Sequence, residues 1–267
     1  LLSIAQLPRA TFYYHLKRMR CADKYEEAKT EITAIYHENK GRYGYRRITT
    51  TLHNRGIHLN HKTVQKLMKE SGLKCMVRMK KYRSYRGEVG KIAPNLLARD
   101  FHAERPNQKW VTDVTEFSLF GSKLYLSPVL DLYNGEIISY AISERANYRQ
   151  VDEMLDKAFS RLPDSSGLIL HSDQGWQYQN VRYQKRLLEK GIRQSMSRKG
   201  NCLDNAVMEN FFGLLKSELL YLRTFQSLDE FCQELIAYLE YYNHNRIKEK
   251  LNGLSPVQYR IQNGFAA

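Results

Sequence analysis

The chain has 267 residues, of which 42% are hydrophobic and 12% aromatic, and this composition is typical of a folded globular protein. No apolar run approaches the roughly 18 residues that a membrane-spanning helix needs, so we expect no membrane partner. The length predicts about two domains, each large enough to bury a core. The cysteines, which lack a Cys-x-x-Cys pair, predict neither disulfides nor a zinc site, and indicate a reducing cytosol. They are Cys21, Cys75, Cys202 and Cys232.

The net charge of +14 arises entirely in the N-terminal part of the chain. Residues 1–105 contain 23 Lys and Arg against 9 Asp and Glu, whereas residues 106–267 contain 19 of each kind. A basic part joined to a neutral part favours a protein that holds a polyanion with one part and performs another task with the other. An ordinary solvated basic surface is the alternative interpretation.

Helical patterns fill the first quarter of the chain. Residues 1–22 contain a helical pattern broken by Pro8, which we interpret as the remnant of an N-terminal helix-turn-helix. Residues 23–73 predict a second helix-turn-helix, which would be a DNA-binding domain, with Asn60 as the N-cap of its last helix. An ordinary three-helix bundle with a polar face is the alternative. The side chains expected to reach DNA phosphates and bases are Arg46, Arg47, Lys62, Gln65, Lys66 and Lys69.

Residues 74–105 predict a basic linker. Its first part, residues 74–91, has seven Lys and Arg against one Glu, with Tyr82 and Tyr85 between them and no sustained apolar period. Such a segment is expected to lie along DNA phosphates and to become ordered there, and a solvated tether is compatible with the same role. The candidate DNA contacts in this linker are Lys80, Lys81, Arg83 and Arg86.

Beyond residue 106 the pattern changes to strands joined by short turns. Strands are expected at residues 109–120, 123–131, 136–143, 168–171 and 192–196. Helices are expected at residues 150–161, 178–190 and 204–220. This order predicts an α/β catalytic core over residues 106–222, a ribonuclease-H-like mixed five-stranded sheet with helices on both faces. Residues 223–267 predict a C-terminal helical extension of that core.

Three acidic residues fall at positions where a site would form. Asp113 lies inside an apolar strand, where a carboxylate is costly unless it is paired or binds a metal. Asp173 directly follows a strand, and Glu209 lies in a helix that Asp204 is expected to cap. Each acid alone has an ordinary structural explanation. Together they supply hard oxygen ligands from separate elements, as two-metal phosphoryl transfer with ions about 4 Å apart requires.

Several neighbours of these acids have narrower expectations. His171 is expected to orient Asp173 and not to act as a general base. Trp110, Trp176 and Tyr178 flank the acids, and the sequence leaves open whether they stack on bases or pack the walls of the site. Asn205 and Lys216 fall close to the helix face of Glu209, one turn before it and two turns after it.

The strings around these acids carry a family resemblance. They are WVTDVTEF, HSDQGWQY, SMSRKGNCLDNAVMENFFGLLKSE and YYNHNRIKEKLNGLSPVQYR, and thirty-five residues separate Asp173 from Glu209. Over nearly the whole chain they resemble the second-reading-frame transposases of bacterial copy-out, paste-in insertion sequences, relatives of retroviral integrases. The resemblance implies that Asp113, Asp173 and Glu209 form a catalytic Asp-Asp-Glu triad and that Lys216 contacts the end of the element. Separately from the resemblance, Asn205 is a further expected DNA contact.

The same resemblance implies an activity. A DNA transposase of this kind uses two Mg²⁺ ions per site, with Mn²⁺ as a substitute, to cleave the ends of the element and to join the freed 3′-OH to DNA. Its implied partners are double-stranded DNA of the terminal inverted repeats and of the target, further copies of the chain on DNA, and the upstream-frame product. We expect a bacterial cytoplasmic protein associated with the nucleoid. The alternatives are a non-catalytic DNA-binding regulator or a plain nuclease of the same fold, and Leu1 is either a natural start, a fragment boundary or a fusion junction.

Overall fold

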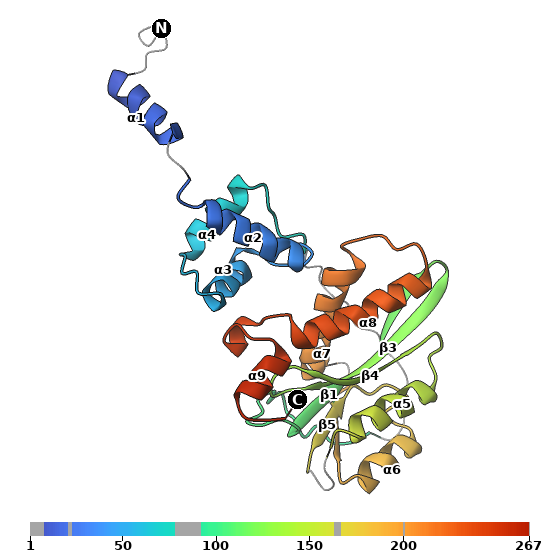
Figure 1. Cartoon of the computed structure of the whole chain (residues 1–267). Helices are drawn as coiled ribbons and strands as arrows, with labels where there is room; N and C mark the ends of the chain where they lie inside the picture. Colours follow the sequence, from blue (N-terminus) through green and yellow to red (C-terminus); the bar gives the residue numbers. More distant parts are fainter. Residues whose placement is uncertain (1–7, 21–22, 78–91, 163–166, 200, 267) are drawn as a thin grey trace. The chain divides into compact units, whose positions relative to one another are not determined.

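The structure, a computed structural model, describes residues 8–20, 23–77, 92–162, 167–199 and 201–266. The chain divides into two compact units, Leu1–Met76 and Val77–Ala267 (Figure 1). None of the described helices combines the length and the apolar character that a membrane crossing requires.

The first unit is helical. Its helices are α1 (Arg9–Arg20), α2 (Glu26–Glu38), α3 (Tyr45–Asn54) and α4 (His61–Glu70). The Asn60 side chain accepts a hydrogen bond from the backbone N–H of Lys62 at 2.9 Å, which confirms the predicted N-cap of α4. The beginning of the predicted N-terminal helix-turn-helix lies outside the described residues.

Helices α2, α3 and α4 pack against one another around a small apolar core. Ile32 and Ile35 of α2, Ile48 and Leu52 of α3, and Val64 of α4 are all fully buried there. The apolar positions recur three or four residues apart, so each helix turns one stripe inward and leaves its polar face exposed. The exposed face of α4 is the one on which the sequence predicted DNA contacts.

The second unit contains one mixed sheet. Its strands are β1 (Lys109–Thr112), β2 (Thr115–Leu119), β3 (Ser122–Asp131), β4 (Ile137–Ser143), β5 (Ile169–Ser172) and β6 (Arg193–Met196). Strand β3 pairs antiparallel with β1, β2 and β4, while β1 pairs parallel with β5 and β5 with β6. The sheet has six strands and not five, because the predicted first strand is interrupted at Asp113 and Val114. The predicted fold class is confirmed.

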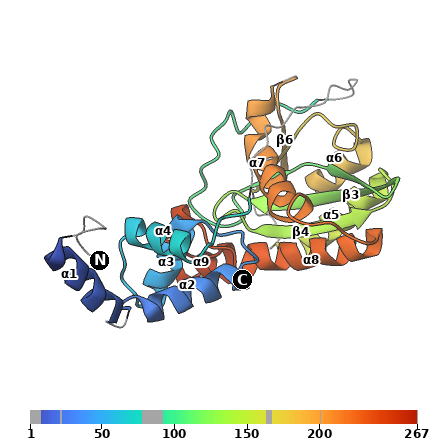
Figure 2. The same ribbon diagram turned by 90° about the horizontal axis from the view of Figure 1, so that it is seen from above.

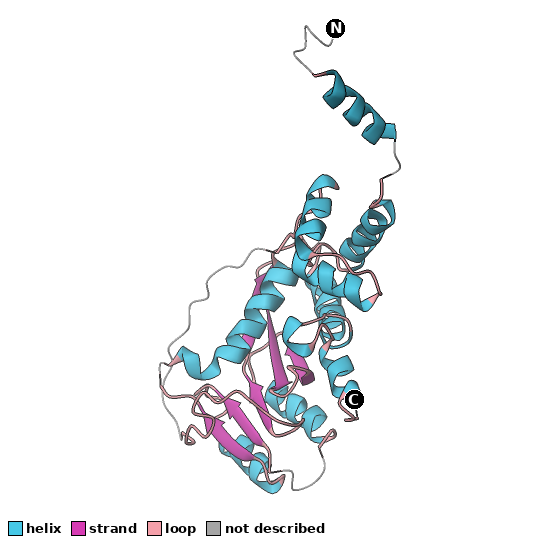
Figure 3. Cartoon of the chain, turned by 90° about the vertical axis from the view of Figure 1, so that its left-hand side faces the viewer, coloured by secondary structure: helices cyan, strands magenta, loops and turns pink. Residues whose placement is uncertain are grey.

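Helices cover both faces of this sheet (Figures 2 and 3). They are α5 (Tyr148–Phe159), α6 (Val181–Glu189), α7 (Ala206–Leu215), α8 (Leu228–His244) and α9 (Pro256–Gln262). A 3₁₀ turn, η1 (Cys202–Asn205), precedes α7, a π-helical turn, η2 (Lys216–Leu220), follows it, and a second 3₁₀ turn, η3 (Glu249–Leu251), precedes α9. Neighbouring residues of β1 face opposite sides: Trp110 packs with α5 and α6, and Val111 packs with α7 and α8.

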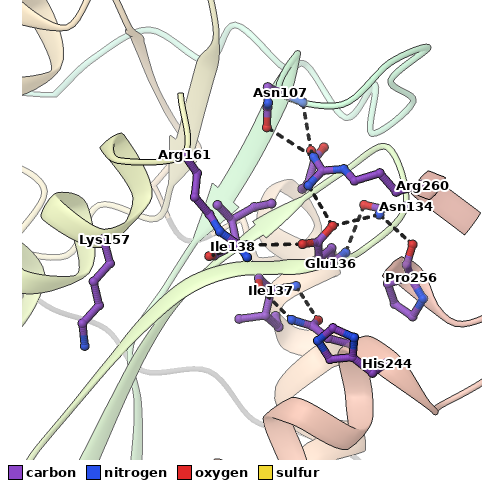
Figure 4. A network of polar contacts seen from close by, with 12 residues as sticks. Asn107, Asn134, Glu136, Ile137, Ile138, Lys157, Arg161, His244, Pro256 and Arg260 are labelled. Atoms are coloured by element: carbon purple, nitrogen blue, oxygen red, sulfur yellow. Dashed lines mark hydrogen bonds and ion pairs between the residues drawn. The ribbon is translucent and has the colours of Figure 1, made fainter. Parts of the chain in front are cut away.

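A buried ionic network attaches the C-terminal helix α9 to the sheet (Figure 4). The guanidinium of Arg260 contacts Glu136 at 2.9 Å and Asp131 at 3.1 Å, and both carboxylates are almost fully buried. Arg161 also donates to Glu136, at 3.3 Å. The network lies at the C-terminal end of β3. Because β1 runs antiparallel to β3, the network is on the side of the sheet where β1 begins, and not where β1 ends.

The last part of the predicted linker packs against the core. Leu97 and Ala103 are buried with the residues of α7 and α8. The backbone N–H of Leu96 donates to the Oγ of Ser195 in β6 at 2.9 Å. The structure therefore differs from the prediction of a linker that extends to residue 105, because residues 92–105 belong to the second unit.

Candidate active site

Asp113 and Asp173 stand next to each other because their strands are parallel neighbours. The register of β1 and β5 pairs Val111 with His171. Two residues further along, the segment after β1 reaches Asp113 and the segment after β5 reaches Asp173. Both carboxylates therefore lie at the C-terminal ends of adjacent strands, where open α/β sheets expose their sites. The sequence expectation that Asp113 lies within a strand is wrong by one residue, since β1 ends at Thr112.

The carboxylate of Asp113 is held by two hydrogen bonds. Its Oδ1 accepts from the backbone N–H of Val114 at 2.7 Å, and its Oδ2 accepts from the side-chain amide of Asn205 at 3.1 Å. Desolvation raises the pKa of Asp113 well above its usual value, and the charges of Asp173 and Glu209 raise it further. The three acids therefore share one electrostatic environment, in which their negative charges repel.

Asp173 begins a tight turn after β5. Its Oδ1 accepts from the backbone N–H of Gly175 at 2.8 Å, and desolvation raises the pKa of this carboxylate. A Cβ atom at residue 175 would approach Oδ1 of Asp173 to 2.9 Å and the amide of Gln177 to 2.6 Å. The absence of a side chain at Gly175 thus lets the backbone come close enough to hold the carboxylate.

Glu209 lies in the first turn of α7, half-buried, and desolvation raises its pKa. Helix α7 packs against β1, and the charge of Glu209 raises the pKa of Asp113. Among the described residues, no three acidic, histidine or cysteine side chains lie close enough together to enclose a metal ion. The three carboxylates form an open cluster whose like charges a cation would neutralise.

Lys216 is half-buried and not a freely solvated surface lysine. Its Nζ lies 5.6 Å from the centroid of the Phe117 ring, a distance at which the ring face attracts a cation. Burial lowers the pKa of Lys216, while the charges of Glu116 and Asp113 oppose this effect. The predicted helix continues through this residue as a π-helical turn, and the charge of Asp113 acts on the ammonium.

Two neighbours of the acids, Asp204 and His171, make contacts other than the expected ones. Asp204 does not cap α7: its carboxylate accepts hydrogen bonds from Arg198, Arg99 and Asn95, and the N-terminus of α7 has no side-chain cap. His171 shows no hydrogen bond to Asp173 among those of the described residues. Its ring contacts the hydroxyl of Ser195 at 2.8 Å and the backbone carbonyl of Asp204 at 3.0 Å, and burial lowers its pKa to about 4.

The sequence also missed the arginines that hold Asp204. Arg198 donates to it from both Nε and Nη2, at 2.8 and 2.9 Å, and Arg99 donates from Nε at 2.9 Å. Arg99 is far from Asp204 in the sequence, and Arg198 is separated from Asp204 by a turn without periodicity. Only the short spacing between Arg198 and Asp204 offered a signal, because acids and arginines this close often pair across a turn.

Asn205 and the aromatic residues receive distinct roles. The Asn205 side chain, expected to contact DNA, is 4% exposed and donates to Asp113 instead, so we reassign it from DNA contact to the interior of the site. Trp110 and Tyr178 are fully buried in the core, where they pack the wall of the site. Trp176 is 55% exposed, which leaves its ring accessible to a base.

The predicted DNA contacts of the helical unit lie on its surface where the structure describes them. Lys62, Gln65, Lys66 and Lys69 are all exposed along α4. Arg46 is exposed at the start of α3, and Arg47 lies half-buried over the ring of Tyr43. The linker residues Lys80, Lys81, Arg83 and Arg86 lie outside the described residues.

Comparison with known proteins gives matches over both units. Residues 103–202 and 209–263 match two models described as integrase core domains, and residues 23–82 match an HTH-like domain. The chain is 59% identical over 262 residues to the transposase InsK of insertion sequence element IS150 from Escherichia coli K12, an alignment that covers 98% of this chain and 93% of that protein. It is 39% identical over 235 residues to the transposase of insertion sequence element IS904 from Lactococcus lactis, covering 87% and 93% of the two chains.

A solved structure is similar to the second unit at a lower level. The integrase catalytic core domain of HTLV-2, in complex with magnesium, is 20% identical, covers 59% of this chain and 99% of its own, and superposes with a TM-score of 0.47.

Proposed function

Because the chain belongs to the transposases of bacterial insertion sequences, we propose that Asp113, Asp173 and Glu209 are its catalytic carboxylates. The proposed reaction frees a 3′-OH at the end of the element and joins that hydroxyl to a second phosphodiester by transesterification. The observation that carries the proposal is the parallel pairing of β1 with β5, which sets two acids at adjacent strand ends beneath a helix that bears the third.

The chemistry of these side chains fits divalent cations. Three carboxylates supply hard oxygen atoms. Desolvation, and then the charges of Asp173 and Glu209, raise the pKa of Asp113, so a cation between the carboxylates would relieve an unfavourable interaction. We assign Mg²⁺ to this cluster, with Mn²⁺ as a substitute and two ions per site. When bound, such ions would activate the attacking oxygen and stabilise the leaving oxygen. The chain's own groups hold Asp113 and Asp173 through the backbone N–H groups of Val114 and Gly175.

Lys216 is proposed to hold the end of the element. Its ammonium lies beside the acidic cluster without forming an ion pair with it in the described residues, and it is backed by the Phe117 ring. The ammonium would contact a DNA phosphate or a base edge that enters the site. It would also neutralise the negative charge of the phosphate, which the carboxylates repel.

The helical unit is proposed to bind the double-stranded terminal repeats. The exposed side chains of α4 and Arg46 of α3 support this role, together with the net charge of the N-terminal region. The basic linker is proposed to follow the DNA backbone. Two element ends and a target duplex require several copies of the chain, so we also propose a homo-oligomer on DNA, with association or fusion to the upstream-frame product.

Charge-removing substitutions of similar size test the proposal. Asp113→Asn, Asp173→Asn and Glu209→Gln each remove one negative charge and little volume, so each is expected to abolish cleavage and joining of element-end DNA while the affinity for that DNA changes less than about threefold. Glu153→Gln, an exposed acid of α5, is the matched control and should retain full activity. Joining at the wild-type rate by any of the three variants would contradict the triad.

A further inference from the structure

The three proposed ligands come from separate elements, and the short turn η1 touches all three of those elements. Asn205, its last residue, donates from Nδ2 to Oδ2 of Asp113 at 3.1 Å. The other carboxylate oxygen of Asp113 accepts from Val114. With one donor on each oxygen, the carboxylate has a fixed rotamer, and Asn205 supplies the only one of these two donors that comes from a side chain.

The same turn is attached to the strand that bears Asp173. Nε2 of His171 lies 3.0 Å from the backbone carbonyl of Asp204, which only accepts, so this nitrogen carries the proton. Nδ1 of the neutral ring then accepts from the hydroxyl of Ser195, which in turn accepts from the N–H of Leu96. Since His171 lies two residues before Asp173, this buried chain of hydrogen bonds connects η1 to the end of β5.

The side chain of Asp204 anchors the turn from the other side. Its carboxylate is fully buried and accepts from the backbone and guanidinium of Arg198, from Nε of Arg99 and from the amide of Asn95. Ala98 and Arg99 have left-handed backbone angles, φ 45° and 68°, which residues with a side chain adopt only when their surroundings hold them. A strained loop and a buried acid together fix the place where α7 begins.

Glu209 is the fourth residue of α7, so the position of η1 determines where its carboxylate lies. We propose that Asp204 and Asn205 form a positioning pair that sets the spacing of the three metal ligands: Asn205 orients Asp113, and Asp204 anchors the helix of Glu209. The inference rests on the proposed function, because the spacing matters only if these acids share cations. Neither residue of the pair is itself assigned as a ligand.

The other atom of the Asn205 amide supports a functional role. Its Oδ1 is buried and has no hydrogen-bond partner among the described residues. Turning the amide over would place this oxygen against Oδ2 of Asp113, so the carboxylate fixes the orientation that leaves Oδ1 unsatisfied. A buried polar atom without a partner is unfavourable for stability, and a functional role for the amide accounts for this cost.

Binding of Mn²⁺ to the full-length chain, measured by the electron paramagnetic resonance signal of the free ion, tests the pair without any turnover. Asn205→Ala and the nearly isosteric Asn205→Leu should each weaken Mn²⁺ binding at least about tenfold, as loss of a partner that orients a ligand typically does. Asp204→Asn should do the same, and Arg99→Ala offers a milder change if that variant does not fold. Asn201→Ala, an asparagine of the same segment, is the matched control and should bind as the wild type does.

The outcomes separate this inference from the proposed function. If Asp113→Asn binds Mn²⁺ like the wild type, the assignment of the metal ligands fails. If Asp113→Asn loses binding while both Asn205 variants keep wild-type affinity, the ligands stand and the positioning pair is overturned. Wild-type affinity in Asn205→Leu with a loss in Asn205→Ala would also overturn it, since packing volume and not the amide donor would then be what matters.

Discussion

Lys216 is half-buried, and the charges of Glu116 and Asp113 act on its ammonium. If it holds the terminal base pairs, Lys216→Ala should weaken cleavage at true element ends by about 1–3 kcal/mol, which is about five- to 150-fold. Metal-dependent nicking of arbitrary DNA should change much less, because no carboxylate is altered. Both activities are measured at one salt concentration, since phosphate contacts depend on salt.

The control for Lys216 is Lys185→Ala, which removes an exposed lysine of α6. An equal loss of both activities in Lys216→Ala would mean that the lysine serves the chemistry or the fold. No loss in either activity would return Lys216 to an ordinary surface role.

Individual residues show where sequence reasoning reaches its limit. Asp113 and Asp173 were predicted to belong to one site, but Asp113 was placed inside its strand, and the parallel pairing of the two strands came from the structure. Asn205 was predicted on the helix face of Glu209 from α-helical spacing, but it ends a 3₁₀ turn with about three residues per turn, which rotates its side chain inward. No local pattern distinguishes these two turns.

At the level of elements, the predicted helix over residues 204–220 is three consecutive pieces: η1, α7 and the π-helical turn η2. A long-range ion pair involves a residue of the π turn. Glu218 within it is 1% exposed and pairs with Arg246, at 2.7 and 2.8 Å, beyond the end of α8. Because Arg246 lies 28 residues away, periodicity within residues 204–220 contains no sign of this ion pair.

This buried pair should matter for the stability of the core. Glu218→Ala leaves the Arg246 guanidinium buried and unpaired, so we expect the core to lose about 3–5 kcal/mol. Replacing both residues, as in Glu218→Leu with Arg246→Met, should lower the stability far less than the sum of the losses from Glu218→Leu alone and Arg246→Met alone. Both tryptophans of the chain, Trp110 and Trp176, belong to the second unit, so tryptophan fluorescence during urea unfolding follows that unit alone.

The pair would be structurally unimportant if Glu218→Ala unfolded at the urea concentration of the wild type. Exposed Glu189→Ala, whose ion pair with Lys185 is solvated, is the matched control and should change the stability by less than about 1 kcal/mol. Strict additivity of the two single changes would show that Glu218 and Arg246 do not act together.

In the molecule as a whole, basic charge and proposed chemistry occupy different parts of the chain. The predicted linker boundary at residue 105 was too late, because Asn95 and Arg99 are bound to the buried Asp204, a contact that composition does not reveal. Residues 92–105 contain two basic and two acidic residues, so residues 92–267 remain neutral with 21 of each kind, and residues 1–91 carry the entire +14.

A fragment of residues 92–267 should therefore bind DNA weakly and with a shallow salt dependence. Each DNA phosphate that a protein neutralises adds about 0.9 to the steepness of log K against log salt, so the full chain should show the much steeper slope. Fluorescence anisotropy with one labelled duplex over a range of salt concentrations measures both proteins. Tryptophan fluorescence of the fragment serves as the control for its folding, and equal slopes for fragment and full chain would contradict the division of roles.

The most direct test of the central claim is a strand-transfer assay with the wild-type chain. An element-end duplex, labelled at the 5′ end of the strand whose 3′ end is to be freed, is incubated with Mg²⁺ and a second, unlabelled duplex, and the products are separated by size under denaturing conditions. A transposase that acts through Asp113, Asp173 and Glu209 should convert the label into a longer strand covalently joined to the second duplex, and this product should vanish in Asp113→Asn. Shortened labelled strands without any joined product would show a plain nuclease, and unchanged DNA bound by the protein would show a non-catalytic regulator.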